Sequence, residues 1–319
     1  MFQADGTSTA TRPSRGYIQL SIRRLFRKKL SVACLFIILI MYGSGIFAPL
    51  VAPYGYNDQD LTKVKQGPSF SNPLGTDRLG RDMLTRVIFS LRTTVIITVI
   101  SLITGSLLLG ITLGLMAGYF GRWVDGIIMR IGEVTASFPD IFLVLIIVAT
   151  VKPRILTWVH NFEDSTGIDW IVRLGIVDYL VISLALAAFS WFGMARLVRG
   201  QVLQVRENQY VEASRAIGSS TLRILTIHVL PNVISPVIVS ISAGLAGIAT
   251  AEIVLSWLGI GIQPPTPSLG VMIFENGNIS VLRSDPHLTL VPSGVLVVLL
   301  FTFNLLGDGI NDAFNPRAR

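Results

Sequence analysis

ENQYVEASRAIGSSTLRILTIHVLP, residues 207–231, is a polar stretch set between two strongly apolar segments. Its first half consists mostly of good helix formers, and Gly218 favours the left-handed conformation that ends many helices. Ser219 or Ser220 can then cap a second helix, which Pro231 ends or kinks. The stretch therefore predicts a water-facing helical hairpin that joins two membrane helices.

The first helix of this hairpin carries a small apolar stripe. Side chains spaced by three, four and seven residues share one face of a helix. Four residues follow this spacing: Tyr210, Ala213, Ser214 and Ile217. Glu212 and Arg215 lie off this face. A compact face of this kind fits a groove on another protein, although an ordinary cytoplasmic loop explains the hairpin equally well when it is taken alone.

The composition indicates a protein of the lipid bilayer. Of the 319 residues, 51% are hydrophobic and only 14% are charged, and the mean hydropathy is +0.64. A hydrocarbon core of about 30 Å needs about 20 helical residues. Six segments approach or exceed that length: 31–52, 94–117, 127–150, 176–195, 233–258 and 288–306. The sequence therefore predicts an all-α integral membrane protein with six transmembrane helices.

The predicted spans divide the chain into five parts. A cytoplasmic tail, residues 1–30, precedes the first transmembrane helix at 31–52, and an external loop follows at 53–92. Five further helices form a core at 93–307, and residues 308–319 form a cytoplasmic tail. In this arrangement 16 of the 26 Lys and Arg residues lie on the N-terminal side, which predicts an N-in, C-in topology by the positive-inside rule.

The basic N-terminal tail suits a membrane surface. Ile18, Ile22, Leu25 and Phe26 share one face of a short predicted helix whose other side is rich in Arg and Lys. The net charge of +7 comes without a nucleic-acid recognition motif, so we expect anionic lipid rather than nucleic acid as the partner. A plain positive-inside anchor explains the same residues equally well.

The hairpin carries a motif that resembles one transporter family. Glu212, Ala213 and Gly218, followed by the Leu230–Pro231 pair, resemble the glutamate–alanine–alanine signature of ABC importer permeases. In that family the signature forms the cytoplasmic coupling helix. Ser214 stands where a second alanine is usual.

Four further segments resemble the dipeptide, oligopeptide and nickel branch of this family. They are NPLGTDRLGRDMLTR at 72–86, GYFGRWVDGIIMRIGEVTASFP at 118–139, LSWLGIGIQPPTPSLG at 255–270 and LLGDGINDAFNPR at 305–317. With the hairpin motif they are spread along nearly the whole chain from residue 72 onward. The chain is similar to the second, C-type permease of that branch, and this resemblance implies the type I permease fold of ABC importers.

The resemblance also implies partners and a location. It implies a homologous second permease, two ATP-binding subunits that dock on the coupling helix near 207–218, and an extracytoplasmic substrate-binding protein. ATP and Mg²⁺ would be bound by the ATP-binding subunits, with no cofactor in this chain. The expected location is the bacterial or archaeal cytoplasmic (inner) membrane, and the expected solutes are peptides, nickel chelates or oligosaccharides.

The sequence offers little catalytic chemistry. It contains no glycine-rich phosphate loop ending in Lys and Ser or Thr, so the energy for transport is expected from another polypeptide. The three histidines, His160, His228 and His287, lie in different predicted loops and do not indicate a metal site. Cys34 is the only cysteine, so no intrachain disulfide can form. We therefore expect a non-catalytic permease subunit.

Glu252 lies deep in the predicted fifth span, where an ionised side chain costs about 2.5–3.5 kcal/mol. We therefore expect it to face water or a partner. It either lines the translocation path or a gate, or belongs to a hydrogen-bond network between subunits. Arg130 and Glu133 are three residues apart and are expected to form an ion pair on a helix surface.

Small residues recur every four positions in the predicted second span: Ser106, Gly110, Gly114 and Gly118. Small side chains at this interval let another helix approach closely in lipid, so we expect this face to be buried.

A secondary transporter is the main alternative function. It would require inverted repeats and ion-binding groups near the middle of the membrane, for which Glu252 is the main candidate. A membrane enzyme is less well supported, because no nucleophile or metal ligands cluster in the sequence.

Overall fold

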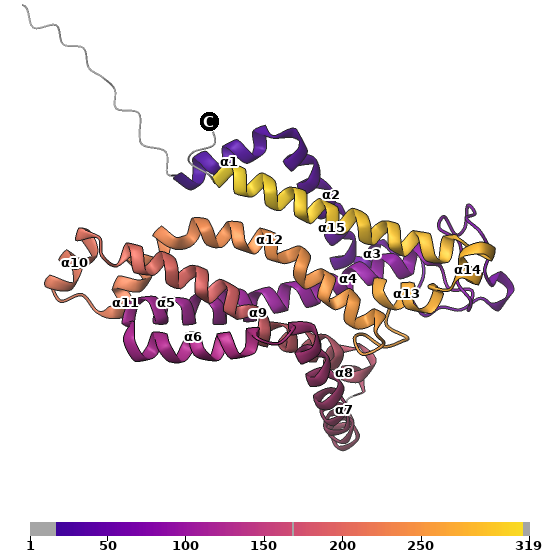
Figure 1. Ribbon diagram of the computed structural model, residues 1–319. Coiled ribbons are helices and arrows are strands. Elements are labelled where there is room, and N and C mark those ends of the chain that lie inside the picture. Colours follow the sequence, from indigo (N-terminus) through magenta and orange to yellow (C-terminus); the bar gives the residue numbers. More distant parts are fainter. Residues whose placement is uncertain (1–16, 168, 315–319) are drawn as a thin grey trace, which may run out of the picture.

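The computed structural model describes residues 17–167 and 169–314, which form an elongated bundle of helices (Figure 1). In this part of the chain six helical runs are long and apolar enough to cross a membrane: Lys29–Ile46, Met83–Phe120, Asp140–Thr166, Ile176–Val205, Thr221–Trp257 and His287–Phe314. The prediction of an all-α protein with six spans is therefore confirmed.

The helices in chain order are α1 (Tyr17–Arg27), α2 (Lys29–Ile46), α3 (Ala48–Val51), α4 (Met83–Ser101), α5 (Thr112–Phe120), α6 (Arg122–Ala136), α7 (Asp140–Thr166), α8 (Trp170–Arg173), α9 (Ile176–Val205), α10 (Gln209–Ala216), α11 (Thr221–Arg223), α12 (Leu230–Trp257), α13 (Leu269–Asn276), α14 (Ile279–Ser284) and α15 (His287–Phe314). Two π-helical segments, Leu102–Ile111 and Ile224–Val229, join α4 to α5 and α11 to α12. Each of these runs therefore forms one long helix.

The predicted third span was wrong in its bounds. The sequence suggested one helix over 127–150, whereas α6 ends at Ala136 and α7 begins at Asp140. Pro139 explains the break, because a proline disfavours the helical conformation of the residue before it. After a tight turn at Gly121 (φ +62°), α6 lies beside α5, and α7 projects from the bundle (Figure 1).

Other helix ends also differ from the predicted bounds. Helix α4 begins at Met83, inside the predicted external loop 53–92, where the Asp82 carboxylate accepts a hydrogen bond from the Thr85 backbone N–H at 2.7 Å. Pro231 does not end the helix that follows the hairpin. It lies where the π-helical segment Ile224–Val229 continues into α12, inside one helical run.

The N-terminal amphipathic helix is present as α1. Ile22 and Phe26 are exposed on it, whereas the side chain of Ile18 lies outside the described residues. Contact of this helix with lipid stays a prediction.

The face of small residues in the second span is buried against α9, as predicted. A Cβ atom built on Gly110 would lie 2.7 Å from the Cβ atom of Met194, and one on Gly118 would lie 2.6 Å from the Cβ atom of Val202. The two backbones can approach this closely because the side chains are absent. The second and fourth spans therefore interlock along much of their length.

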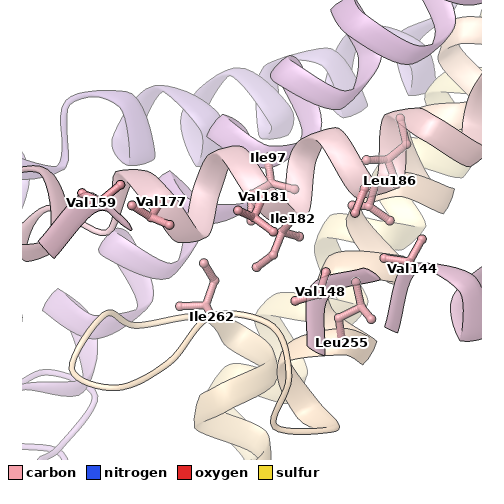
Figure 2. Packing of buried hydrophobic residues seen from close by; sticks show 12 residues of the cluster. Ile97, Val144, Val148, Val159, Val177, Val181, Ile182, Leu186, Leu255 and Ile262 are labelled. Atoms are coloured by element: carbon pink, nitrogen blue, oxygen red, sulfur yellow. The ribbon is translucent and has the colours of Figure 1, made fainter. Parts of the chain in front are cut away.

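A hydrophobic cluster joins α4, α7, α9 and α12 (Figure 2). Ile182 and Leu255 are fully buried in it, and Ile262 reaches it from the loop after α12. Figure 1 shows α1, α10 and the end of α15 at one end of the bundle, and α13 and α14 at the other. This arrangement agrees with the N-in, C-in topology, which places the hairpin and both ends of the chain on one side.

Candidate functional site

The predicted hairpin consists of α10, the turn after it and α11. Val211 is fully buried and fixes α10 to the bundle, where it packs in a cluster with Val202 of α9 and with Ile224 and Val233 beyond the hairpin. Ser214 lies one turn from Val211 and is also buried. Of the predicted stripe, Ser214 therefore faces this chain itself, and Tyr210, Ala213 and Ile217 remain exposed.

The turn after α10 forms as the sequence predicted. Gly218 has a φ of +80°. The Gly218 N–H donates to the Arg215 carbonyl at 2.9 Å, and the Ser219 N–H donates to the Ser214 carbonyl at 3.1 Å, which together make a Schellman motif. The Ser220 hydroxyl then caps α11 by accepting a hydrogen bond from the Arg223 N–H. The shape of the hairpin is therefore fixed by local chemistry.

The outer side of the hairpin is apolar and uncovered in this chain. Ile217 is 83% exposed, Leu222 is 71% exposed and Tyr210 is 44% exposed. Glu212 is exposed, and its carboxylate has no hydrogen-bond or ion-pair partner among the described residues. We call Tyr210, Glu212, Ala213, Ile217 and Leu222 the hairpin surface.

Two arginines, one in the hairpin and one at the end of α9, contact the end of the second span. The Arg215 guanidinium carbon lies 4.7 Å from the centroid of the Tyr119 ring, and its Nε donates to the Tyr119 hydroxyl at 3.3 Å. The Arg206 Nη1 donates to the Gly118 carbonyl at 2.9 Å. The hairpin is therefore held by residues of both the second and the fourth spans.

Glu252 is fully buried and faces neither water nor a free surface, which corrects the expectation from the sequence. Its Oε1 accepts hydrogen bonds from the hydroxyls of Ser268 at 2.9 Å and Ser256 at 3.0 Å, and its Oε2 accepts one from Thr94 at 3.1 Å. These partners lie on α12, on α4 and just before α13. The network is therefore internal to this chain, and a role of Glu252 on the translocation path stays a prediction.

Four charged residues form an ion-pair cluster at the end of the bundle opposite the hairpin: Asp77, Arg81, Arg86 and Glu275. Asp77 accepts hydrogen bonds from Arg81 Nε at 2.7 Å and from Arg86 Nη1 at 2.6 Å, and Arg86 Nη2 lies 3.2 Å from Glu275. Burial alone would raise the pKa of Asp77. The pKa nevertheless lies below its ordinary value, because three groups stabilise the carboxylate by more than burial destabilises it: the Arg86 charge, the Arg81 backbone N–H and the Arg81 charge.

The charged side chains between residues 77 and 82 therefore all bond within the chain. Asp82 caps α4, and Arg78 donates to the backbone carbonyl of Glu275. The predicted surface pair is also present, with Arg130 Nη1 3.9 Å from Glu133 and both side chains exposed.

A cavity of about 320 Å³ lies between the π-helical segment 102–111, the start of α7, α9 and α12. Asp140 lines it together with the hydroxyl residues Ser106, Ser190 and Ser240. Asp140 was missed because the predicted third span ran through it. A carboxylate inside an apolar segment was the signal that could have found it. Within the described residues, no group of three or more His, Cys, Asp and Glu side chains could hold a metal ion.

Two protein-family models match the chain. Residues 110–319 match the binding-protein-dependent transport system inner membrane component. Residues 16–68 match the N-terminal TM domain of oligopeptide transport permease C. The chain belongs to this permease family. The resemblance seen in its motifs is thereby confirmed.

The permease is also similar to named transport proteins over most of its length. It is 34% identical over 308 residues to the dipeptide transport system permease protein DppC of Bacillus subtilis, with 97% of this chain and 88% of the relative covered. It is 34% identical to the glutathione transport system permease protein GsiD of Pectobacterium atrosepticum, with 93% and 90% covered. It is 34% identical to the oligopeptide transport system permease protein OppC of Mycobacterium bovis, with 94% of each covered.

These findings identify the permease as a multi-pass inner membrane subunit of an ABC transport system, with the type I permease fold. The family and the relatives are transport permeases, as expected for a non-catalytic membrane subunit. They place the chain among ABC permeases rather than among secondary transporters.

Proposed function

We propose that the permease forms half of an import path for peptides. A homologous second permease forms the other half, and an extracytoplasmic binding protein delivers the solute. Two ATP-binding subunits, which hold ATP and Mg²⁺, supply the energy, and one of them docks on the hairpin surface. The dipeptide, glutathione and oligopeptide named for the relatives support a peptide as the solute.

The observation that carries this proposal is a rigidly held hairpin with an uncovered apolar side. Val211 and the turn at Gly218 fix the hairpin, whereas Ile217 and Leu222 extend away from the bundle. Large apolar side chains exposed together on a fixed surface are typical of protein–protein contacts. The hairpin lies at the same end as α1 and the end of α15, which is the side predicted to be cytoplasmic.

Docking at this surface gives a simple mechanism. Closure of the ATP-binding subunits displaces the hairpin, and the spans attached to it change between outward-open and inward-open arrangements. Shifting such an equilibrium from 1:99 to 99:1 takes about 5.5 kcal/mol. A contact with several exposed apolar side chains and an unpaired carboxylate at Glu212 can contribute a large part of that difference.

The test uses the whole transporter, purified with its second permease and ATP-binding subunits and reconstituted in vesicles with its binding protein. Ile217→Asp should abolish copurification of the ATP-binding subunits and ATP-dependent uptake of a dipeptide. Leu61→Asp is the matched control, because Leu61 is likewise highly exposed, at 71% against 83% for Ile217, but lies in the segment before α4, at the opposite end of the bundle.

Each part of the proposal has its own contrary outcome. Normal copurification and uptake with Ile217→Asp would refute docking at the hairpin surface. A wild-type complex that assembles and hydrolyses ATP, yet takes up no dipeptide in the presence of its binding protein, would refute the peptide as the solute.

A further inference from the structure

Asp140 is the first residue of the third span and lines the cavity at the start of α7. The same cavity is bounded by Ser106, Ser190 and Ile248, which lie inside the second, fourth and fifth spans rather than at their ends. An ionised side chain in the middle of a bilayer costs about 2.5–3.5 kcal/mol on insertion scales, unless it faces water or a partner. The charge therefore requires a polar or cationic neighbour that this cavity can admit.

No cation of the described part of the chain neutralises Asp140. Its side chain is exposed, and its Oδ1 accepts a hydrogen bond from the backbone N–H of Ile141 at 2.8 Å. By contrast, the buried Lys152 is paired with Asp178 at 3.0 Å. Asp140 is thus available to a positively charged group that enters the cavity.

The rest of the cavity suits a small organic cation better than a metal ion. Its volume of about 320 Å³ lies within the range of small-ligand sites, roughly 300–1,000 Å³. Ile141, Phe189 and Met194 give it apolar walls, and Ser190 and Ser240 add hydroxyls. A divalent cation would need several carboxylate or carbonyl oxygens, and Asp140 is the sole carboxylate of this lining.

We infer that Asp140 binds the positively charged ammonium group of a peptide as the peptide passes through this cavity. This inference rests on the proposed function, and it adds a recognition site in the permease to any selectivity of the binding protein. An ammonium group donates up to three charge-assisted hydrogen bonds, which a carboxylate accepts at short distance. The apolar walls then accommodate the peptide side chains.

A local role of Asp140 in its own helix can be separated from this one. Asp140 begins α7, where a negative charge interacts favourably with the helix dipole by about 0.3–1 kcal/mol. Asp140→Asn keeps an oxygen that can accept the Ile141 N–H, but it removes the charge. Asp164→Asn is the matched control, because Asp164 is an exposed carboxylate on the same helix and does not line the cavity.

The first experiment measures initial rates of ATP-dependent uptake of alanyl-alanine by the reconstituted transporter with its binding protein. Asp140→Asn should lower the rate about tenfold, the loss expected for one charge-assisted hydrogen-bond partner, with normal assembly and ATP hydrolysis. Asp140→Glu should restore much of the rate, and Asp164→Asn should equal the wild type. A wild-type rate with Asp140→Asn would overturn the inference.

A second measurement decides the matter if Asp140→Asn does not assemble. Asp140→Cys can be labelled with a water-soluble thiol reagent, and the unmodified chain serves as the background because Cys34 is buried. Labelling that alanyl-alanine slows during turnover supports the site, and absent or unprotected labelling overturns it. If wild-type transporter assembles but takes up no dipeptide, the proposed function fails, and this inference fails with it.

Discussion

The Arg215 guanidinium carbon lies 4.7 Å from the centroid of the Tyr119 ring. Arg215 belongs to the hairpin that follows the fourth span, whereas Tyr119 closes the second span at the end of α5. Together with the hydrogen bond from Arg206 to the Gly118 carbonyl, this contact makes the position of the hairpin depend on two spans. The hairpin is therefore not a free loop.

Replacement of Tyr119 should loosen the hairpin. A cation–π contact at an exposed site contributes about 0.5–1 kcal/mol, so Tyr119→Leu should raise hydrogen exchange of the α10 amides by about two- to fivefold. Tyr119→Phe keeps the ring and should show most of the wild-type protection. The measurement is hydrogen–deuterium exchange of residues 209–217, and unchanged exchange in Tyr119→Leu would contradict the role given to this contact.

Gly218→Val should uncouple ATP hydrolysis from transport. No neighbouring atom would obstruct a Cβ at Gly218, so the cost comes from its φ of +80°, which is unfavourable for an L-residue by roughly 1–2 kcal/mol. The hairpin would change shape, and less solute would be imported per ATP hydrolysed. Gly218→Asn is the control, because asparagine tolerates this conformation. Wild-type coupling in Gly218→Val would argue strongly against the hairpin as the coupling element.

Asp77→Asn should strongly destabilise the permease. The Asp77 and Arg86 side chains are almost fully buried, and removing one charge of a buried pair costs about 3–5 kcal/mol. The melting temperature in detergent should therefore fall by several degrees. Asp169→Asn should leave it nearly unchanged, because Asp169 and its partner Arg173 are both highly exposed, and exposed pairs contribute about 0–1 kcal/mol.

The effect of Asp77→Asn should also depend on pH. The pKa of Asp77 is lowered in the folded protein, so its carboxylate stabilises the fold fully above the ordinary pKa of 3.8. That contribution is lost as the pH falls through the lowered pKa of the folded state. The difference in melting temperature between wild type and Asp77→Asn should therefore be largest near neutral pH and shrink in strong acid. A difference that grows on acidification would contradict the assignment.

Glu252→Gln should assemble and transport nearly as the wild type does. The remaining side-chain oxygen of the glutamine can accept hydrogen bonds from the Ser256 and Ser268 hydroxyls. Its amide group faces Thr94, whose hydroxyl can still donate to the Ser90 carbonyl at 3.3 Å. Glu252→Leu removes every acceptor and should cost at least about 1–3 kcal/mol through unsatisfied hydroxyls. Melting temperature and uptake should be compared for both variants. A large loss of transport in a fully assembled Glu252→Gln would return this residue to the translocation path.

Gly114→Ala should destabilise the bundle. A Cβ there would lie 2.6 Å from the Ala195 carbonyl oxygen and 2.7 Å from the Val198 Cβ, so α9 would have to move. Overpacking of this kind costs about 1–3 kcal/mol. Gly126→Ala is the control, because nothing lies within 4 Å of that position. Equal melting temperatures for the two variants would contradict the close approach of α5 and α9.

The sequence predicted those parts of the structure that depend on neighbouring residues. Long apolar runs indicated the six spans, and Gly218 marked the end of α10 because a left-handed turn is a property of one residue. The break before Asp140 was missed because an apolar run continues on both sides of Pro139, so hydrophobicity outweighed the proline signal.

Contacts between distant residues could not be predicted in the same way. Arg86 and Glu275 are 189 positions apart, and Thr94 and Glu252 are 158 apart. Nothing local to either member shows which partner the fold will supply. The cost of burying a carboxylate in the membrane predicted that Glu252 needs polar partners. It did not predict that hydroxyls of the same chain would be those partners.

The glycine-lined seam between the second and fourth spans has a consequence for the transport stroke. Two spans packed this closely cannot slide past one another, so they move as one rigid unit. The hairpin lies at one end of this unit, and Ser190 and Ser106 lie further along it. A displacement of the hairpin is therefore transmitted to the cavity lined by Asp140 with little loss.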